Sequence, residues 1–141
     1  MKRWLGVSVL VLIGCGGGDS DRTPEQVVEA YLRAGSAENA EEVRANLDPG
    51  CHSDEAMVRV DSVRMMGAPI TIEELTVEAV SSGEDQASVR YSVAGPAHGS
   101  GGTSEVFGVQ VTTGEVNIDH AEQSGTLSLR RVDGAWRVAC N

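Results

Sequence analysis

The residues most able to do chemistry in this chain are three cysteines and three histidines: Cys15, Cys51, Cys140, His52, His98 and His120. Cys51 is followed directly by His52, and an adjacent base can activate a thiol as a nucleophile. Adjacent residues rarely meet in the geometry that this requires, and no third group that would orient the histidine is evident. The sequence therefore favours a non-catalytic role for this pair.

Asp119-His120 is a second candidate for acid-base chemistry. A histidine that titrates near neutrality suits proton transfer, and a carboxylate beside it could act as a base. Neighbours on a strand point to opposite faces, so the two side chains can line one pocket only if the strand is bulged. If the protein is an enzyme, Asp119 or His120 is therefore the expected base.

The spacing of the metal-ligating residue types does not predict a metal site. His52, His98 and His120 show no His-x-x-x-His spacing, and the cysteines show no Cys-x-x-Cys spacing. The acidic pairs lack the alternating aspartates of a calcium loop. The glycine-rich segment 95–104 lacks the Gly-Lys-Ser/Thr of a phosphate-binding loop. We expect neither a metal nor a cofactor.

The amino terminus has the features of an export signal. Lys2 and Arg3 precede a short apolar run over residues 5–13, which has the length of a signal-peptide core and not the ~20 residues of a membrane-spanning helix. The run ends at Leu12-Ile13-Gly14-Cys15, a tetrapeptide that resembles the bacterial lipobox. The resemblance implies cleavage before Cys15, a diacylglycerol on its thiol and acylation of the new amino terminus.

On this interpretation residues 1–14 are a lipoprotein signal peptide, residues 15–22 are the lipidated cysteine with a flexible tether, and residues 23–141 are the domain. Several acyl chains on one residue give a stable anchor, since each buried methylene contributes ~0.8 kcal/mol. Gly16 stands where an aspartate retains some lipoproteins at the inner membrane, which favours the outer membrane if the cell is Gram-negative. The alternative is an incidental Cys15 behind another kind of signal.

The assignment of Cys15 to lipid leaves Cys51 and Cys140 as a pair in an oxidising compartment. We therefore expect a disulfide between them. The alternatives are two separate buried thiols or an exposed reactive thiol.

Length and charge restrict the class of protein. A chain of 141 residues with 40% hydrophobic composition suits one domain. It has 21 acidic and 11 basic residues, and cleavage of residues 1–14 would also remove Lys2, its one lysine. Nucleic-acid affinity comes mostly from clustered basic residues that neutralise phosphates. We therefore exclude nucleic acid as a partner.

Helical periodicity covers the first half of the domain. Thr23, Pro24 and Gln26 have the types and spacing of a capping box with proline at the first helical position. A second helix is expected over 37–47, ended by Asp48-Pro49-Gly50, and a third over 53–66. The expected inward side chains are Val27, Val28, Tyr31, Leu32, Ala40, Val43, Leu47, Met57, Val58 and Met65.

From Pro69 the period of the apolar residues changes to two, which indicates strands. Strands are expected over 70–80, with an irregularity near Glu73-Glu74, and over 87–93, 106–111, 116–120, 126–132 and 135–140. Asp133-Gly134 suits a tight hairpin turn, whereas 95–104 is expected to be a mobile loop. The side chains expected to share a face are Phe107, Val109 and Val111 in one strand, and Trp136, Val138 and Cys140 in the last.

Two stretches carry a family resemblance. TPEQVVEAYLRAGSAENAEEVRANLDPG, residues 23–50, is similar to the amino-terminal helices of NTF2-like (cystatin-like superfamily) domains, especially those of small bacterial lipoproteins. LRRVDGAWRVAC, residues 129–140, is similar to their final hairpin. The resemblance implies an α+β fold in which amino-terminal helices pack on a curved antiparallel sheet, forming a cone with a pocket.

These observations together predict a lipid-anchored protein of the bacterial envelope. We expect a non-catalytic module that binds a small apolar ligand, a peptide or another envelope protein through the concave sheet or its rim. The alternative is an NTF2-like pocket enzyme of the isomerase or hydrolase type, with Asp119 or His120 as base. A homodimer through the exposed face of the sheet is a third expectation.

Overall fold

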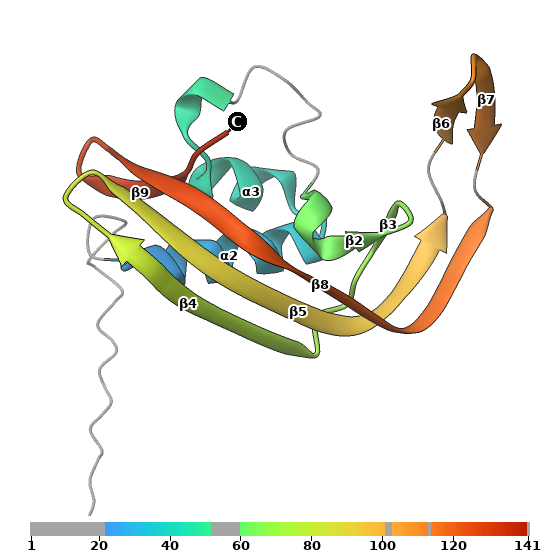
Figure 1. Cartoon of the computed structure of the whole chain (residues 1–141), viewed down its shortest axis with the longest axis horizontal. Coiled ribbons are helices and arrows are strands. Elements are labelled where there is room, and N and C mark those ends of the chain that lie inside the picture. The colour runs from blue at the N-terminus through green and yellow to red at the C-terminus, as the bar shows by residue number, and fades with distance from the viewer. Residues whose placement is uncertain (1–21, 52–59, 101–102, 113, 141) are drawn as a thin grey trace, which may run out of the picture.

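The computed structural model describes residues 22–51, 60–100, 103–112 and 114–140. Its main sheet has four antiparallel strands in the order β4-β5-β8-β9, formed by Glu74–Ser82, Gln86–Ser100, Glu115–Val132 and Ala135–Val138. Helix α2, Pro24–Ser36, lies against one face of this sheet, and α3, Ala40–Asn46, packs beside α2 (Figure 1). The α+β class with helices on one face of an antiparallel sheet is confirmed in this coarse form.

The first helix begins as its capping box predicts. The backbone N–H of Gln26 donates to Thr23 Oγ1 at 3.2 Å, and the backbone N–H of Thr23 donates to Gln26 Oε1 at 2.9 Å. These two bonds satisfy donors that a helix start otherwise leaves without partners. The four residues of the predicted apolar stripe, Val27, Val28, Tyr31 and Leu32, are all buried.

The second helix is shorter than predicted. Glu38 has a φ of 57°, which no helical residue adopts, so the chain turns between the two helices and α3 starts only at Ala40. Asn39 caps it, because its Oδ1 accepts from the N–H of Glu42 at 3.2 Å. Val43 is buried as predicted, and a short 3₁₀ turn, Pro49–Cys51, follows α3.

The predicted third helix is wrong where the structure describes it. Residues 52–59, with Met57 and Val58, lie outside the described part. Beyond them the chain forms a 3₁₀ turn, Asp61–Val63, and then a small ribbon of β2, Arg64–Met65, and β3, Ala68–Pro69. The ribbon turns at Met66 and Gly67, with φ of 54° and 90°, and long-range pairing to β5 overrides the helical spacing.

The β4–β5 hairpin is confirmed, but its irregularity is elsewhere. The register shifts between Ala79 and Ser81, and not at the predicted Glu73-Glu74. Along β5 the residues Ala87, Val89, Tyr91 and Val93 are buried in alternation, which agrees with the strand predicted over 87–93. These four side chains form the inner face on which α2 packs.

The prediction of a mobile loop over 95–104 is wrong for its described residues. Strand β5 continues to Ser100 and pairs with β8, with His98 opposite Asn117. The glycine at position 95 leaves no Cβ to collide with the backbone of Thr71, which crosses close to it. The N–H of Thr71 donates to the carbonyl of Pro96 at 2.8 Å. Glycine therefore permits a close crossing of backbones, which local composition does not reveal.

Beyond this crossing β5 and β8 form a two-stranded ribbon that bends toward the side of the helices (Figure 1). A small hairpin, β6 (Thr103–Val106) with β7 (Val109–Thr112), lies at its far end. Phe107 and Gly108 are its turn, so the predicted shared face of Phe107 with Val109 is wrong.

The final hairpin is confirmed. Val132 pairs with Ala135 across Asp133 and Gly134, whose φ values of 53° and 84° suit the predicted tight turn. Trp136 and Val138 are both buried. Cys140 lies beyond the end of β9 and is exposed, so the prediction that it shares a face with Trp136 and Val138 is wrong.

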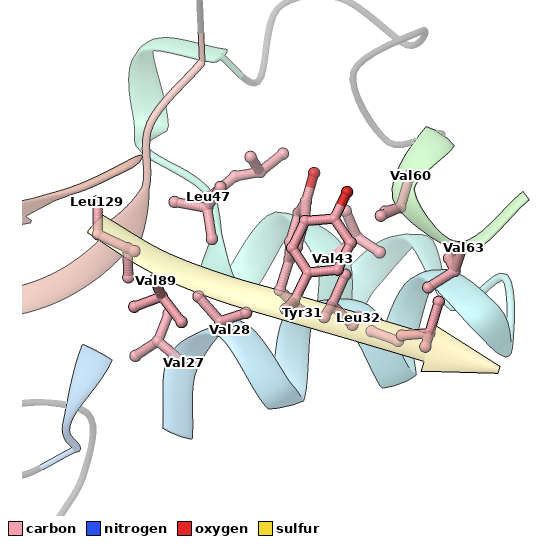
Figure 2. Packing of buried hydrophobic residues seen from close by; sticks show 14 of the residues in the cluster. Val27, Val28, Tyr31, Leu32, Val43, Leu47, Val60, Val63, Val89 and Leu129 are labelled. Carbon is pink, nitrogen blue, oxygen red and sulfur yellow. The ribbon is translucent and has the colours of Figure 1, made fainter. Parts of the chain in front are cut away.

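The core fills the space between α2 and the inner face of the sheet. Figure 2 shows Val27 and Val28 of α2 beside Val89 of β5, with Tyr31 and Leu32 farther along the same helix. Leu47, Ile70 and Leu129 close the cluster from three other segments and are almost completely buried. This face of the sheet is therefore occupied by the chain's own side chains.

Candidate functional site

The predicted disulfide joins Cys51 to Cys140, with an S–S distance of 2.09 Å and a Cα–Cα distance of 5.9 Å. Two backbone contacts bring the segments together. Leu47 bridges to Val138, and the N–H of Asp48 donates to the carbonyl of Val138 at 2.9 Å. A bonded Cys51 has no thiol to serve as a nucleophile.

Cys15 and His52 lie outside the described residues. The lipidation of Cys15, the signal peptide 1–14 and most of the tether 15–22 stay predictions. Within the described part of the chain, no helix is both long and apolar enough to cross a bilayer.

The strand that carries Asp119 and His120 is bulged at these residues. Gly95 pairs with Ala121 and Ala97 with Ile118, so two residues of β8 stand opposite Pro96 alone. The bulge leaves both side chains exposed. His120 Nε2 lies 2.7 Å from Glu122 Oε2, with both side chains well exposed. The bulge therefore allows Asp119 and His120 to share a face, but both side chains are exposed to solvent and are not enclosed in a cavity.

The described histidines do not meet. His98 Nδ1 lies 3.0 Å from Asn117 Oδ1 on the bent ribbon, on the far side of the bulge from Glu122. No group of three or more His, Cys, Asp or Glu side chains within the described ranges is arranged to hold a metal ion.

The interior holds a polar pair that sequence reasoning missed. Tyr31 of α2 and Tyr91 of β5 are each only 8% exposed. Burial, followed by the Coulombic effect of Asp61 and then of Tyr91, raises the pKa of Tyr31 to about 12. Tyr31 is among the predicted inward side chains and Tyr91 lies in the strand predicted over 87–93, but only the packing of α2 on β5 brings the two near.

Tyr91 lies over a glycine of the neighbouring strand. A Cβ added at Gly125, its register partner, would come 2.9 Å from the Tyr91 hydroxyl oxygen. The glycine therefore makes room for the ring. The two tyrosines therefore place polar hydroxyl groups inside an otherwise largely apolar cluster.

The outer face of the sheet is open and polar. Side chains that alternate with the core residues, such as Ser88, Ser128 and Arg130, line a hollow of about 720 Å³ near the β4–β5 turn. Arg130 Nη1 lies 3.3 Å from Asp48 Oδ2, and its side chain is mostly exposed. An antiparallel sheet commonly leaves one face solvated in this way.

The most exposed apolar group in the described structure lies at the end of the bent ribbon. Phe107 is 101% exposed, Val109 is 61% exposed and Val106 is 45% exposed. Sequence reasoning placed Phe107 on a strand face with Val109. The signal that could have found the turn is Gly108, since a glycine at the second turn position suits a two-residue hairpin.

No protein-family model matches the chain, and no curated protein is similar enough to count as a match. The class that the structure itself defines is an α+β domain with one covered and one open sheet face.

Proposed function

We propose that this protein is a lipoprotein of the bacterial envelope, anchored through acylated Cys15, whose domain is a non-catalytic binding module. The anchor is supported by the basic start, the short apolar run and the lipobox-like residues 12–15. The Cys51–Cys140 disulfide is compatible with an extracytoplasmic address, because such bonds persist mainly in oxidising compartments. If the cell is Gram-negative, we favour the outer membrane.

We further propose that the domain is NTF2-like. The support is the order of elements, two amino-terminal helices followed by antiparallel strands, and the packing of α2 across the sheet. The bend of the long β5–β8 ribbon toward the helices adds curvature of the expected kind (Figure 1).

The observation that carries the binding role is the contrast between the inside and the outside of the domain. Leu32, Val89 and Leu129 are at most 2% exposed and fill the inner face, whereas apolar side chains stand free at the hairpin turn. Because exposed apolar groups in water are unfavourable unless something covers them, the contrast favours a partner on the surface. A small apolar ligand inside is the less favoured form of the same role.

The anchor is tested by metabolic labelling with an alkyne analogue of palmitate, followed by membrane fractionation. The wild-type chain should carry label and sediment with membranes. Cys15→Ser should carry no label and appear in the soluble fraction, with the Cys51–Cys140 bond still present on a non-reducing gel. Label that persists in Cys15→Ser, or a variant that loses its disulfide, would contradict the assignment.

The bulge at Asp119-His120 is the observation that favours the second candidate, a pocket enzyme with one of these residues as base. The test is turnover of a panel of aryl esters and enolisable ketones. Turnover by the wild-type chain that His120→Ala or Asp119→Asn abolishes would support an enzyme. Rates equal to the uncatalysed background would remove it.

A further inference from the structure

The β6–β7 hairpin carries a compact apolar tip, which we define as residues 106–109. Val106, Phe107 and Val109 are its three large exposed hydrophobic residues, and Phe107 is the one phenylalanine of the whole chain. Burial of a phenylalanine removes about 150–250 Å² from water, so this side chain alone could anchor an interface.

The backbone conformation of the tip is one that phenylalanine rarely adopts. Phe107 and Gly108 have φ of 52° and 79°, almost the values of Asp133 and Gly134 in the final hairpin. Such a turn prefers Asn-Gly or Asp-Gly, and a bulky residue at positive φ is unfavourable. The final hairpin has the preferred residue, whereas the tip has an aromatic one. The preference of the turn therefore does not explain Phe107. Glu38 and Met66 also have positive φ, but Phe107 differs from both because it presents a fully exposed aromatic ring, and such a strained residue is grounds for a hypothesis of function.

The charge around the tip indicates what kind of surface would receive it. Between Arg90 and Arg130 the sequence contains no lysine or arginine. The same stretch carries the carboxylates Glu105, Glu115, Asp119 and Glu122. All four of these side chains are exposed. These four carboxylates form what we call the acidic stem of the tip. A binding surface complementary to the tip and its stem would be an apolar pocket with a basic rim.

The position and the charge of the tip argue against a bilayer as the binding surface, and its charge argues against a second copy of the chain. Figure 1 shows the tip at the opposite end of the molecule from the start of α2, which follows the predicted tether. Anionic lipid would repel the carboxylates, and two stems brought together would double the like charge. We propose that the tip inserts Phe107 into an apolar pocket, lined at its rim by lysine or arginine, on another envelope protein. This names the partner surface of the binding role proposed above and rests on that role.

The first experiment places a photo-crosslinking amino acid, p-benzoylphenylalanine, at position 107 of the full-length chain in the cells that make it. Position 80 is the matched control, because Val80 is another large exposed apolar residue and lies on β4 of the main sheet. We expect a discrete adduct with a different protein at 107 and none at 80. An adduct only with lipid, only with a second copy, or equally at both positions would overturn the proposal, as would no adduct at 107.

The second experiment measures the affinity of the crosslinked protein, once purified, for the detergent-solubilised full chain. Phe107→Asn gives the turn its preferred residue and removes the ring, and should weaken binding by at least about tenfold. Val80→Ser should leave the affinity unchanged. Glu105→Gln should slow association and reduce its dependence on salt between about 0.05 and 0.5 M, whereas Glu84→Gln, in the distant β4–β5 turn, should not.

Equal losses for the Phe107 and Val80 variants, or an affinity that salt does not alter, would refute the tip as the docking element. The two proposals fail separately. If Cys15 is not acylated, the adduct at 107 and the effect of Phe107→Asn on affinity persist. If the tip is not a docking element, the labelling and sedimentation of the wild-type chain are unaffected.

Discussion

Removal of the Cys51–Cys140 disulfide is the perturbation whose magnitude the structure defines best. The bond closes a loop with a sequence separation of 89 residues, which contains most of the sheet. In the chain-entropy model a crosslink that closes so long a loop lowers the free energy of the folded state relative to the unfolded state by about 4–5 kcal/mol. A domain of this size has a total stability of about 5–15 kcal/mol, so the loss would be a large part of it.

The assay is urea unfolding of the fragment 19–141, compared with its Cys51→Ser/Cys140→Ser variant. We expect the variant to lose about 4–5 kcal/mol on linear extrapolation, and its m value to rise because the unfolded chain is no longer held compact. Thiol titration of the unfolded, unreduced fragment should find no free thiol. A loss below about 1 kcal/mol, or two titratable thiols, would refute the reasoning.

Three further predictions concern the helix and the core. The wild-type domain should lose about 2–3 kcal/mol of stability between pH 10 and pH 12, and Tyr31→Phe should abolish this loss. The loss arises because the raised folded-state pKa lets the unfolded chain release this proton first, so the stability is full below pH 10 and falls above it. Thr23→Ala should cost about 1 kcal/mol through the lost cap. Gly35→Ala should cost about 1–3 kcal/mol, since its Cβ would lie 2.5 Å from Val60 Cβ.

Denaturant unfolding of the fragment 19–141 checks each of these three predictions. No lysine contributes to the alkaline experiment, because Lys2 is the one lysine of the chain and is absent from the fragment 19–141. A Tyr31→Phe variant that loses as much stability as the wild type at high pH would contradict the assignment. Gly83→Ala, in an open turn, should be close to neutral and serves as the control for Gly35→Ala. Equal effects of the two glycine variants would contradict the packing argument.

The parts of the fold that are predictable from sequence have local causes. The capping box at Thr23 and the Asp133-Gly134 turn each act within a few residues, so their elements begin and turn where expected. The burial of Val27 and Val89 follows from the period of their own helix and strand.

The parts that are not predictable depend on pairing between distant segments. The glycine-rich segment becomes a strand because Ile70 and Thr71 cross at Ala97 and Pro96, and no local pattern encodes that crossing. The end of the predicted third helix becomes β2 for the same reason. For the candidate site, the disulfide is predictable from the cysteine count, whereas the exposure of Phe107 depends on a turn inside a run that otherwise alternates like a strand.

The most direct test of a module that binds at its surface is a crystal structure of the fragment 19–141, purified from cells without refolding. Our account predicts that Tyr31, Leu32 and Val89 fill the space between α2 and the sheet, with no density of another molecule there, and that Phe107 stands clear of the domain. An open cavity between α2 and the sheet, or a ligand bound in it, would contradict the account.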